Sequence, residues 1–214
     1  MADYSSDMEQ VEALKRWWSE NGRSIIAGAV IAIVGLLGWQ QWGAYQDQQA
    51  LDASNEYLAF LEQLRGDAPD GGLGRGERLI EKHADSPYAA LAALWMASHH
   101  VEQGALEQAE ARLRWASEQA DGEHFRELAS LRLANVLLAR ADPAAALAVL
   151  ERIDQGAYSA LAGELRGDAH AARGEREQAA ASYRAALEND GLSGQRRQLL
   201  ELKLRDLGAG ESLS

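Results

Sequence analysis

Histidine is the residue type in this sequence with the widest chemical scope, because its ring nitrogens bind metals and transfer protons near neutral pH. The chain contains five: His83, His99, His100, His124 and His170. No pair follows the HExxH spacing of a zinc-binding helix. His99 and His100 are adjacent, so on a helix their side chains point about 100° apart and cannot readily share a metal. We expect these rings to serve packing, and we expect no metal site.

Carboxylates are the second candidate for chemistry, since paired acids can act as general acid and base. Pairs such as Glu107 with Glu110 belong to a chain with 33 acidic residues, in which solvated acids are expected. No Ser, His and Asp arrangement has a recognisable signature. The absence of cysteine excludes a thiolate nucleophile, a disulfide and a cysteine-ligated zinc. The sequence therefore predicts a protein that is not an enzyme.

A glycine-rich stretch, RGDAPDGGLGRG, lies between two expected helices, Gln46 to Leu64 and Arg75 to His83. Its glycines do not form a phosphate loop, because no strand precedes them, no GxGxxG is completed and no GK[ST] follows. We predict a flexible connector here and no bound cofactor.

The charge of the chain limits its partners. It has 214 residues and a formal net charge of −12 at pH 7, and its length suits one domain of about 150 residues with an accessory segment. Residues 1–45 contain five acids and three bases, so the remainder still has a net charge of −10. Such a surface repels phosphate backbones, and the sequence predicts no nucleic-acid partner.

An uncharged run of 23 residues, Ser24 to Gln46, precedes the acidic body. As a helix it spans about 34 Å, enough for the hydrocarbon core of a membrane. Trp39, Trp42 and Tyr45 at its end suit a membrane interface. We predict a transmembrane helix over 24–45; a cleaved signal peptide and a buried helix of a soluble core are the alternatives.

The charges on either side of this run predict its orientation. Lys15, Arg16 and Arg23 precede the run, whereas the first basic residue after it is Arg65. By the positive-inside rule, residues 1–23 form a cytoplasmic tail and the body is periplasmic, in a bacterial inner membrane. The stretch MEQVEALKRWW in the tail has the spacing of a short amphipathic helix, which we expect to lie on the inner-membrane lipid.

The body contains three similar segments of close to 34 residues, the length of a helix-turn-helix repeat. Gly104, Ala141 and Gly174 hold the turn position, at offsets of 37 and 33. Four further positions recur in the three copies: Ala97, Ala134 and Gly167; Ala109, Ala146 and Ala179; Leu113, Leu150 and Tyr183; and Ala116, Ile153 and Ala186. The sequence predicts an all-α array of helical hairpins over 46–208 and a C-terminal tail, 209–214. An ordinary α-bundle is the alternative.

Two segments flank the expected repeats. Ser86 and Pro87 suit the N-cap and first turn of the first repeat helix. The last segment, GQRRQLLELKLRDLG, predicts a capping helix. Its leucines are expected to cover the end of the stack: Leu199, Leu200, Leu202, Leu204 and Leu207.

Stacked hairpins of this kind line a concave surface with their first helices. Ten inward positions define the predicted partner-binding groove: Leu91, Leu94, Ser98, Val101, Leu128, Leu131, Asn135, Leu138, Leu161 and Glu164. An exposed groove of leucine and valine is an interaction site by default. The alternative is that the helix from Gln46 to Leu64 fills the groove, which would then be core.

Three segments together resemble the YfgM-like family of bacterial inner-membrane proteins: QVEALKRWWSENGR before the span, DSPYAALAALWMA at the first repeat and RQLLELKLRDL at the end. The resemblance implies a single-pass type II protein with a periplasmic tetratricopeptide-like domain. It also implies a scaffold that binds the Sec translocon channel, a membrane-anchored periplasmic chaperone and exported client proteins. A regulator that controls a cytoplasmic stress-signalling factor through its N-terminal tail is the alternative function.

Overall fold

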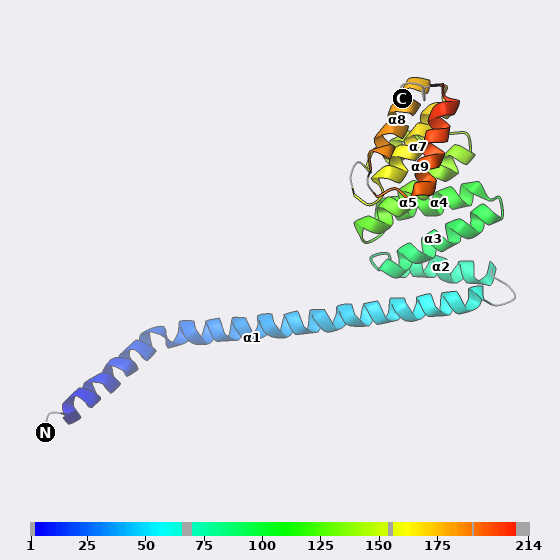
Figure 1. Ribbon diagram of the computed structural model, residues 1–214. Coiled ribbons are helices and arrows are strands. Elements are labelled where there is room, and N and C mark those ends of the chain that lie inside the picture. The colour runs from blue at the N-terminus through cyan, green and yellow to red at the C-terminus, as the bar shows by residue number, and fades with distance from the viewer. Residues whose placement is uncertain (1–2, 66–69, 154–155, 190, 209–214) are drawn as a thin grey trace. The chain divides into compact units, whose positions relative to one another are not determined.

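Figure 1 shows the computed structural model of the protein, which describes residues 3–65, 70–153, 156–189 and 191–208. Within these ranges every regular element is an α-helix, which confirms the all-α fold. The predicted tail 209–214 lies outside the described residues. The helices are α1 (Asp3–Leu64), α2 (Asp70–Lys82), α3 (Pro87–Glu102), α4 (Leu106–Gln119), α5 (Glu123–Ala139), α6 (Pro143–Leu150), α7 (Ser159–Ala172), α8 (Arg176–Leu187) and α9 (Gly194–Asp206).

The chain divides into two compact units, residues 1–51 and 52–214, and α1 contributes to both. Apolar side chains of the first unit are exposed, among them Ile31, Leu36 and Trp39. The segment Leu14–Leu64 is the one helix, among the described residues, that is long and apolar enough to cross a membrane. Only 6% of its most apolar window is buried, whereas a helix of a soluble core is buried on most faces. It is therefore a candidate membrane span.

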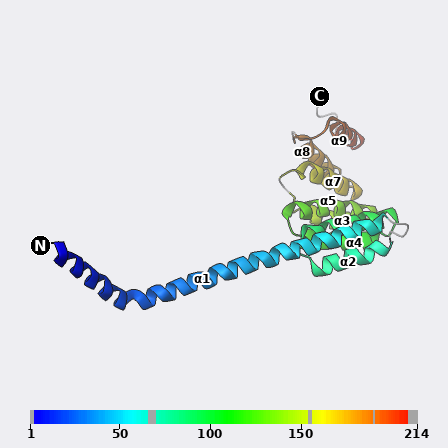
Figure 2. The same ribbon diagram turned by 90° about the horizontal axis from the view of Figure 1, so that it is seen from below.

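The second unit is a stack of helical hairpins (Figure 1). The end of α1, from Asp52, packs on α2, where Arg75 Nε donates a hydrogen bond of 2.8 Å to Gln63 Oε1. Then α3 pairs with α4, α5 with α6 and α7 with α8, and α9 packs on α8. Because α4 also packs on α5 and α6 on α7, each hairpin lies against the next. Figure 2 shows the same order along the stack.

The three predicted turn residues all adopt the left-handed backbone conformation. Their φ angles are 72° at Gly104, 59° at Ala141 and 76° at Gly174. Each of the three helices ends with the same pair of hydrogen bonds; at Gly104 they run from Gly104 N to Val101 O and from Ala105 N to His100 O. This is a Schellman motif, which satisfies carbonyls that the helix leaves unpaired. The turns confirm the repeat register, and Ala141 is the one described non-glycine residue with a positive φ.

The recurring small and large positions of the repeats are all buried, so they form the contact between the helices of each hairpin. Ala109, Ala146 and Ala179 have no exposed surface. Gly167 shows how close the contact is, because a Cβ atom added there would lie 2.2 Å from Cε1 of Tyr183. The tyrosine ring therefore takes the space that a methyl group occupies at Ala97 and Ala134 in the other repeats.

The glycine-rich connector is where the structure corrects the sequence-based expectation. From Asp70 onward this segment belongs to α2, which thus begins five residues before the expected Arg75. A Cβ atom at Gly72 would lie 2.5 Å from Leu64 Cδ2, and one at Gly76 would lie 2.5 Å from Met96 Sδ. These glycines let α2 approach its neighbours closely, and such tertiary packing overrides their low helix propensity.

Two further predictions can be compared with the structure: the N-cap of α3 and the burial of the leucines of α9. Ser86 caps α3 as predicted, with its Oγ accepting a hydrogen bond from Ala89 N and Pro87 following in the first turn. In α9, only Leu200 and Leu204 are buried, and Leu199 and Leu202 are more than 40% exposed. The prediction that all the leucines of α9 cover the stack is therefore wrong, because a single helix can turn only one face to it.

Candidate functional site

The ten predicted groove residues differ in exposure, and the structure does not bring them together in one open surface. Leu94 and Leu131 are only 4% exposed and belong to the main apolar core. Glu164 is also buried, on α7. The half-buried members are Leu91, Leu128, Leu138 and Leu161, and the exposed members are Ser98, Val101 and Asn135. Only the last group has side chains that are exposed enough to contact a partner directly.

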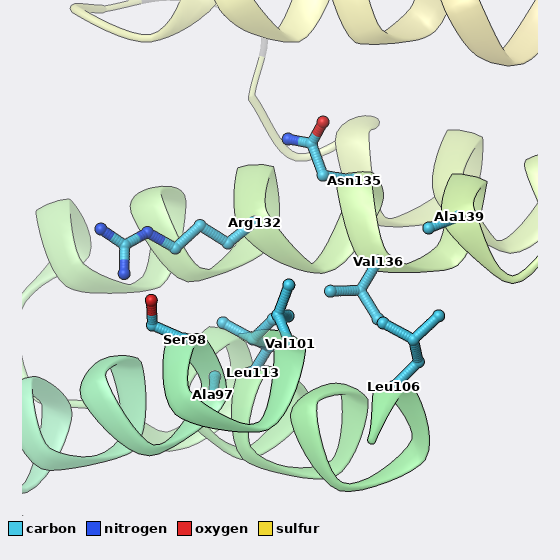
Figure 3. Close-up of a pocket in the computed structure, with 9 residues that line it drawn as sticks. All are labelled: Ala97, Ser98, Val101, Leu106, Leu113, Arg132, Asn135, Val136 and Ala139. Atoms are coloured by element: carbon cyan, nitrogen blue, oxygen red, sulfur yellow. The ribbon is translucent and has the colours of Figure 1, made fainter. Parts of the chain in front are cut away.

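These three exposed residues share one pocket of about 260 Å³ between α3, α4 and α5 (Figure 3). Nine residues line it: Ala97, Ser98, Val101, Leu106, Leu113, Arg132, Asn135, Val136 and Ala139. The periodicity of the first helices predicted Ser98, Val101 and Asn135. It did not predict the remaining six as site residues. Five of them lie on α4 or on other positions of α5, and the sixth, Ala97 of α3, is expected at the contact between the helices of its hairpin.

The polar groups of the pocket lie on its rim. Figure 3 shows the Arg132 guanidinium above the Ser98 hydroxyl, and the aliphatic side chains beside them. Arg132 Nη1 donates a long hydrogen bond of 3.5 Å to the carbonyl of Leu94, and Asn135 Nδ2 donates one of 3.0 Å to the carbonyl of Leu131. No carboxylate of the described residues forms an ion pair with Arg132.

The equivalent face of α7 has the opposite character, since Lys203 of α9 covers it. Lys203 Nζ lies 2.6 and 2.8 Å from the two carboxylate oxygens of Asp168 and 3.0 Å from Glu164 Oε1. Arg196 lies 3.3 Å from the other oxygen of Glu164. Tyr183 donates a hydrogen bond of 2.7 Å to Asp168; burial and then this bond raise the pKa of Tyr183 well above its usual range. This polar cluster is occupied by the chain itself.

A second pocket, of about 240 Å³, lies where α4, α5 and the end of α6 meet. Its lining is mostly charged: Ser117, Glu118, Glu123, Arg126, Glu127, Ser130, Arg152 and Ile153. Arg126 is held by a hydrogen bond of 2.8 Å to the Ala120 carbonyl. Charges of both signs therefore surround this pocket, and no single ligand chemistry is favoured.

The histidines take part in packing and hydrogen bonds. The ring of His99 stacks on Trp95 with centroids 5.3 Å apart, and His170 Nδ1 lies 2.7 Å from Glu175 Oε2. Burial, and then electrostatic interactions with the neighbouring His99 and Arg112, lower the pKa of His100. Across the described ranges, no group of three or more His, Asp or Glu side chains is arranged to hold a metal ion.

Comparison with known proteins identifies the family and the fold to which this architecture is similar. The tetratricopeptide repeat-like domain family matches residues 15–209. A solved structure, MamA 41-end from Desulfovibrio magneticus RS-1, shares the fold with a TM-score of 0.54 at 19% identity, over 75% of this chain and 88% of that one.

The curated relatives align over nearly their whole length. The ancillary SecYEG translocon subunit of Aggregatibacter actinomycetemcomitans is 34% identical, over 97% of this chain and 100% of that protein. The protein of the same name from Escherichia coli (strain K12) is 28% identical, over 97% of this chain and 99% of that protein. The chain therefore belongs to the YfgM-like family of tetratricopeptide repeat-like proteins, whose curated members are ancillary subunits of the SecYEG translocon.

Proposed function

We propose that this protein is a membrane-anchored scaffold that binds protein partners at the Sec translocon and, with a periplasmic chaperone, assists exported proteins. One observation supports this most: the chain aligns from end to end with ancillary SecYEG translocon subunits. It combines a candidate membrane span with a stack of helical hairpins. A scaffold needs surfaces rather than reacting groups, which agrees with a pocket lined mainly by aliphatic side chains.

The proposed topology is a cytoplasmic tail over 1–23, a span over 24–45 and a periplasmic domain over 46–208, with a short tail at 209–214. The bases Lys15, Arg16 and Arg23 before the span support this orientation. Leu14, Trp17 and Trp18 in the tail are more than half exposed, and together with these bases they suit a helix at the surface of anionic lipid.

A reporter that is active only in the periplasm tests the topology. Fused after Ser214 it should be active, and the mature protein should begin near Met1. An inactive reporter, or a mature N-terminus between Trp39 and Ala50, would contradict the proposal.

Photo-crosslinking in intact cells tests the scaffold function. A photoreactive residue at Ser98 or Asn135, on the pocket rim, should capture translocon or chaperone subunits, whereas one at the exposed Ala111 of α4 should capture them far less. The full chain should also co-purify with the SecYEG channel. Deletion of residues 1–14, which keeps the orienting bases Lys15, Arg16 and Arg23, should leave both the capture and the co-purification intact. If they disappear together with the tail, the regulatory alternative is favoured.

A further inference from the structure

The size of the pocket between α3 and α5 limits what it can hold. Its volume of about 260 Å³ lies below the range of roughly 300–1,000 Å³ that is usual for small-molecule ligands. It exceeds the cavity of about 150 Å³ that suffices for one benzene ring. A pocket of this size has room for one large apolar side chain of another polypeptide segment.

The charge at the rim narrows the choice of segment. Two arginines of the adjacent helix α4 have carboxylate partners: Arg112 lies 2.8 Å from Glu77, and Arg114 lies 2.8 Å from Glu110. Arg132 has no such partner among the described residues, although the chain has 33 acids against 21 bases. Its 3.5 Å bond to the Leu94 carbonyl is too long to hold it firmly. A carboxylate from outside would complete its bonding.

We infer that this pocket binds a segment of a protein partner in which a large apolar side chain is followed or preceded within one helical turn by Asp or Glu. The apolar side chain enters between Val101, Leu106 and Val136. The carboxylate accepts two hydrogen bonds from the Arg132 guanidinium, a strong and directional pairing. The Ser98 hydroxyl, beneath the guanidinium in Figure 3, donates a third.

The last repeat supports this assignment by contrast. Asp168 holds the position in α7 that Ser98 holds in α3 and Asn135 in α5, six residues before the turn. There an acidic side chain faces inward, and Lys203 of the same chain neutralises it at 2.6 Å. At the rim of the pocket the charge is basic, and the described part of the chain supplies no counter-ion for it. This inference rests on the proposed scaffold function and specifies the partner chemistry at its pocket.

Peptide selection on the full-length protein in detergent micelles tests the inference. A random peptide library is selected against the wild type, against Arg132→Glu and against Arg152→Glu, which makes the same charge change at the second pocket. Wild type and Arg152→Glu should enrich peptides with a large apolar residue and Asp or Glu within four positions. Arg132→Glu should enrich Lys or Arg in place of the acid.

The affinity of the best peptide is then measured for the wild type and for each variant, which makes the test quantitative. Fluorescence anisotropy should show binding at least tenfold weaker to Arg132→Glu and within twofold of wild type for Arg152→Glu. Ala139→Trp, which fills the pocket from an exposed position, should weaken binding at least tenfold. Arg132→Gln keeps the packing of the side-chain stem and replaces Arg132→Glu if that variant melts early.

Three outcomes would overturn the inference: no peptide enriched, the same acidic preference in Arg132→Glu, or unchanged affinity in Ala139→Trp. Co-purification with the SecYEG channel is measured on the same variants. If it persists while peptide recognition fails, the pocket assignment falls and the scaffold function stands. If the wild type itself does not co-purify with the channel, the scaffold function falls.

Discussion

The inner faces of α5 and α7 occupy equivalent places in the array, yet one is an open apolar pocket and the other a closed polar cluster. Ten residues before the turn, α5 has Leu131 and α7 has Glu164; six residues before it, they have Asn135 and Asp168. Leu131 joins the main core, whereas Glu164 and Asp168 bind Lys203 of α9. The backbone register is shared, so the difference arises from side-chain chemistry.

This contrast shows that the repeat register determines where each inner face lies. It does not determine whether other side chains of the same chain cover that face. Two carboxylates turned inward at the end of the stack attract the chain's own lysine, which offsets the cost of their desolvation. The pocket has an aliphatic lining and a single arginine, and none of the described carboxylates pairs with that arginine. The array therefore leaves one inner face open and uses another to hold its last helix.

The largest expected effect is a difference in stability loss between a core residue and a pocket residue of the inner faces. Leu131→Ala should lower the free energy of unfolding by about 2–5 kcal/mol, because it leaves a cavity in a packed core. Val101→Ala, at a pocket residue that is 44% exposed, should cost less than about 1 kcal/mol. Chemical denaturation of the full chain in micelles measures both. Equal losses would remove the distinction between the two positions.

The close contact in the last hairpin gives the second prediction. Gly167→Ala places a methyl group against the Tyr183 ring, and we expect a net loss of about 2 kcal/mol even though alanine favours the helix. In a Tyr183→Leu background the same change should be neutral or stabilising. A double-mutant cycle measures this coupling; additive effects would show that the ring is not the obstacle.

The third prediction compares the removal of one cation from each face, Lys203 from the polar cluster and Arg132 from the pocket. Lys203→Met should cost about 1–3 kcal/mol, since it leaves Glu164 and Asp168 with only Arg196 and Tyr183 as partners. Arg132→Met removes the same charge from the pocket and should stay within about 0.5 kcal/mol. The measurement is again denaturation. A large loss for Arg132→Met would mean that this arginine stabilises the fold.

The smallest effect concerns the turns. Ala141 adopts φ 59° where the equivalent residues are Gly104 and Gly174. A left-handed conformation costs an alanine about 1–2 kcal/mol, and the greater flexibility of glycine in the unfolded chain offsets part of this. Ala141→Gly should therefore raise the free energy of unfolding by up to about 1 kcal/mol, and Gly104→Ala should lower it by a similar amount. A loss of stability in Ala141→Gly would contradict the shared turn geometry.

The turns and the helix contacts could be predicted from the sequence because each depends on local chemistry. A small residue at a fixed distance from a turn has one role wherever the hairpin lies. The helical state of Gly71 to Gly76 could not be predicted, because it depends on side chains of Leu64, Phe60 and Met96 that approach from other helices.

The candidate site was predictable only in part, for a similar reason. Helical periodicity placed Ser98, Val101 and Asn135 on the inner face, and in the structure all three line one pocket. It could not separate them from Leu94, whose burial depends on how neighbouring hairpins pack. Arg132 gave no signal in the sequence, since one arginine in a highly charged chain is usually a solvated side chain. That no carboxylate of the described residues pairs with it is visible only in three dimensions.

The apolar cores of the second unit are divided unequally along the stack. One cluster runs from Ala53 to Ala169, and a smaller one joins α8 and α9 through Ala179, Tyr183, Leu200 and Leu204. In a linear array, each part is held only by its neighbours, so a weakly anchored end frays before the middle opens. The amide protons of α9 should therefore exchange with solvent earlier than those of α5. Fraying at this end would separate Lys203 from Glu164 and Asp168 and expose both carboxylates to solvent, while the apolar pocket stays folded.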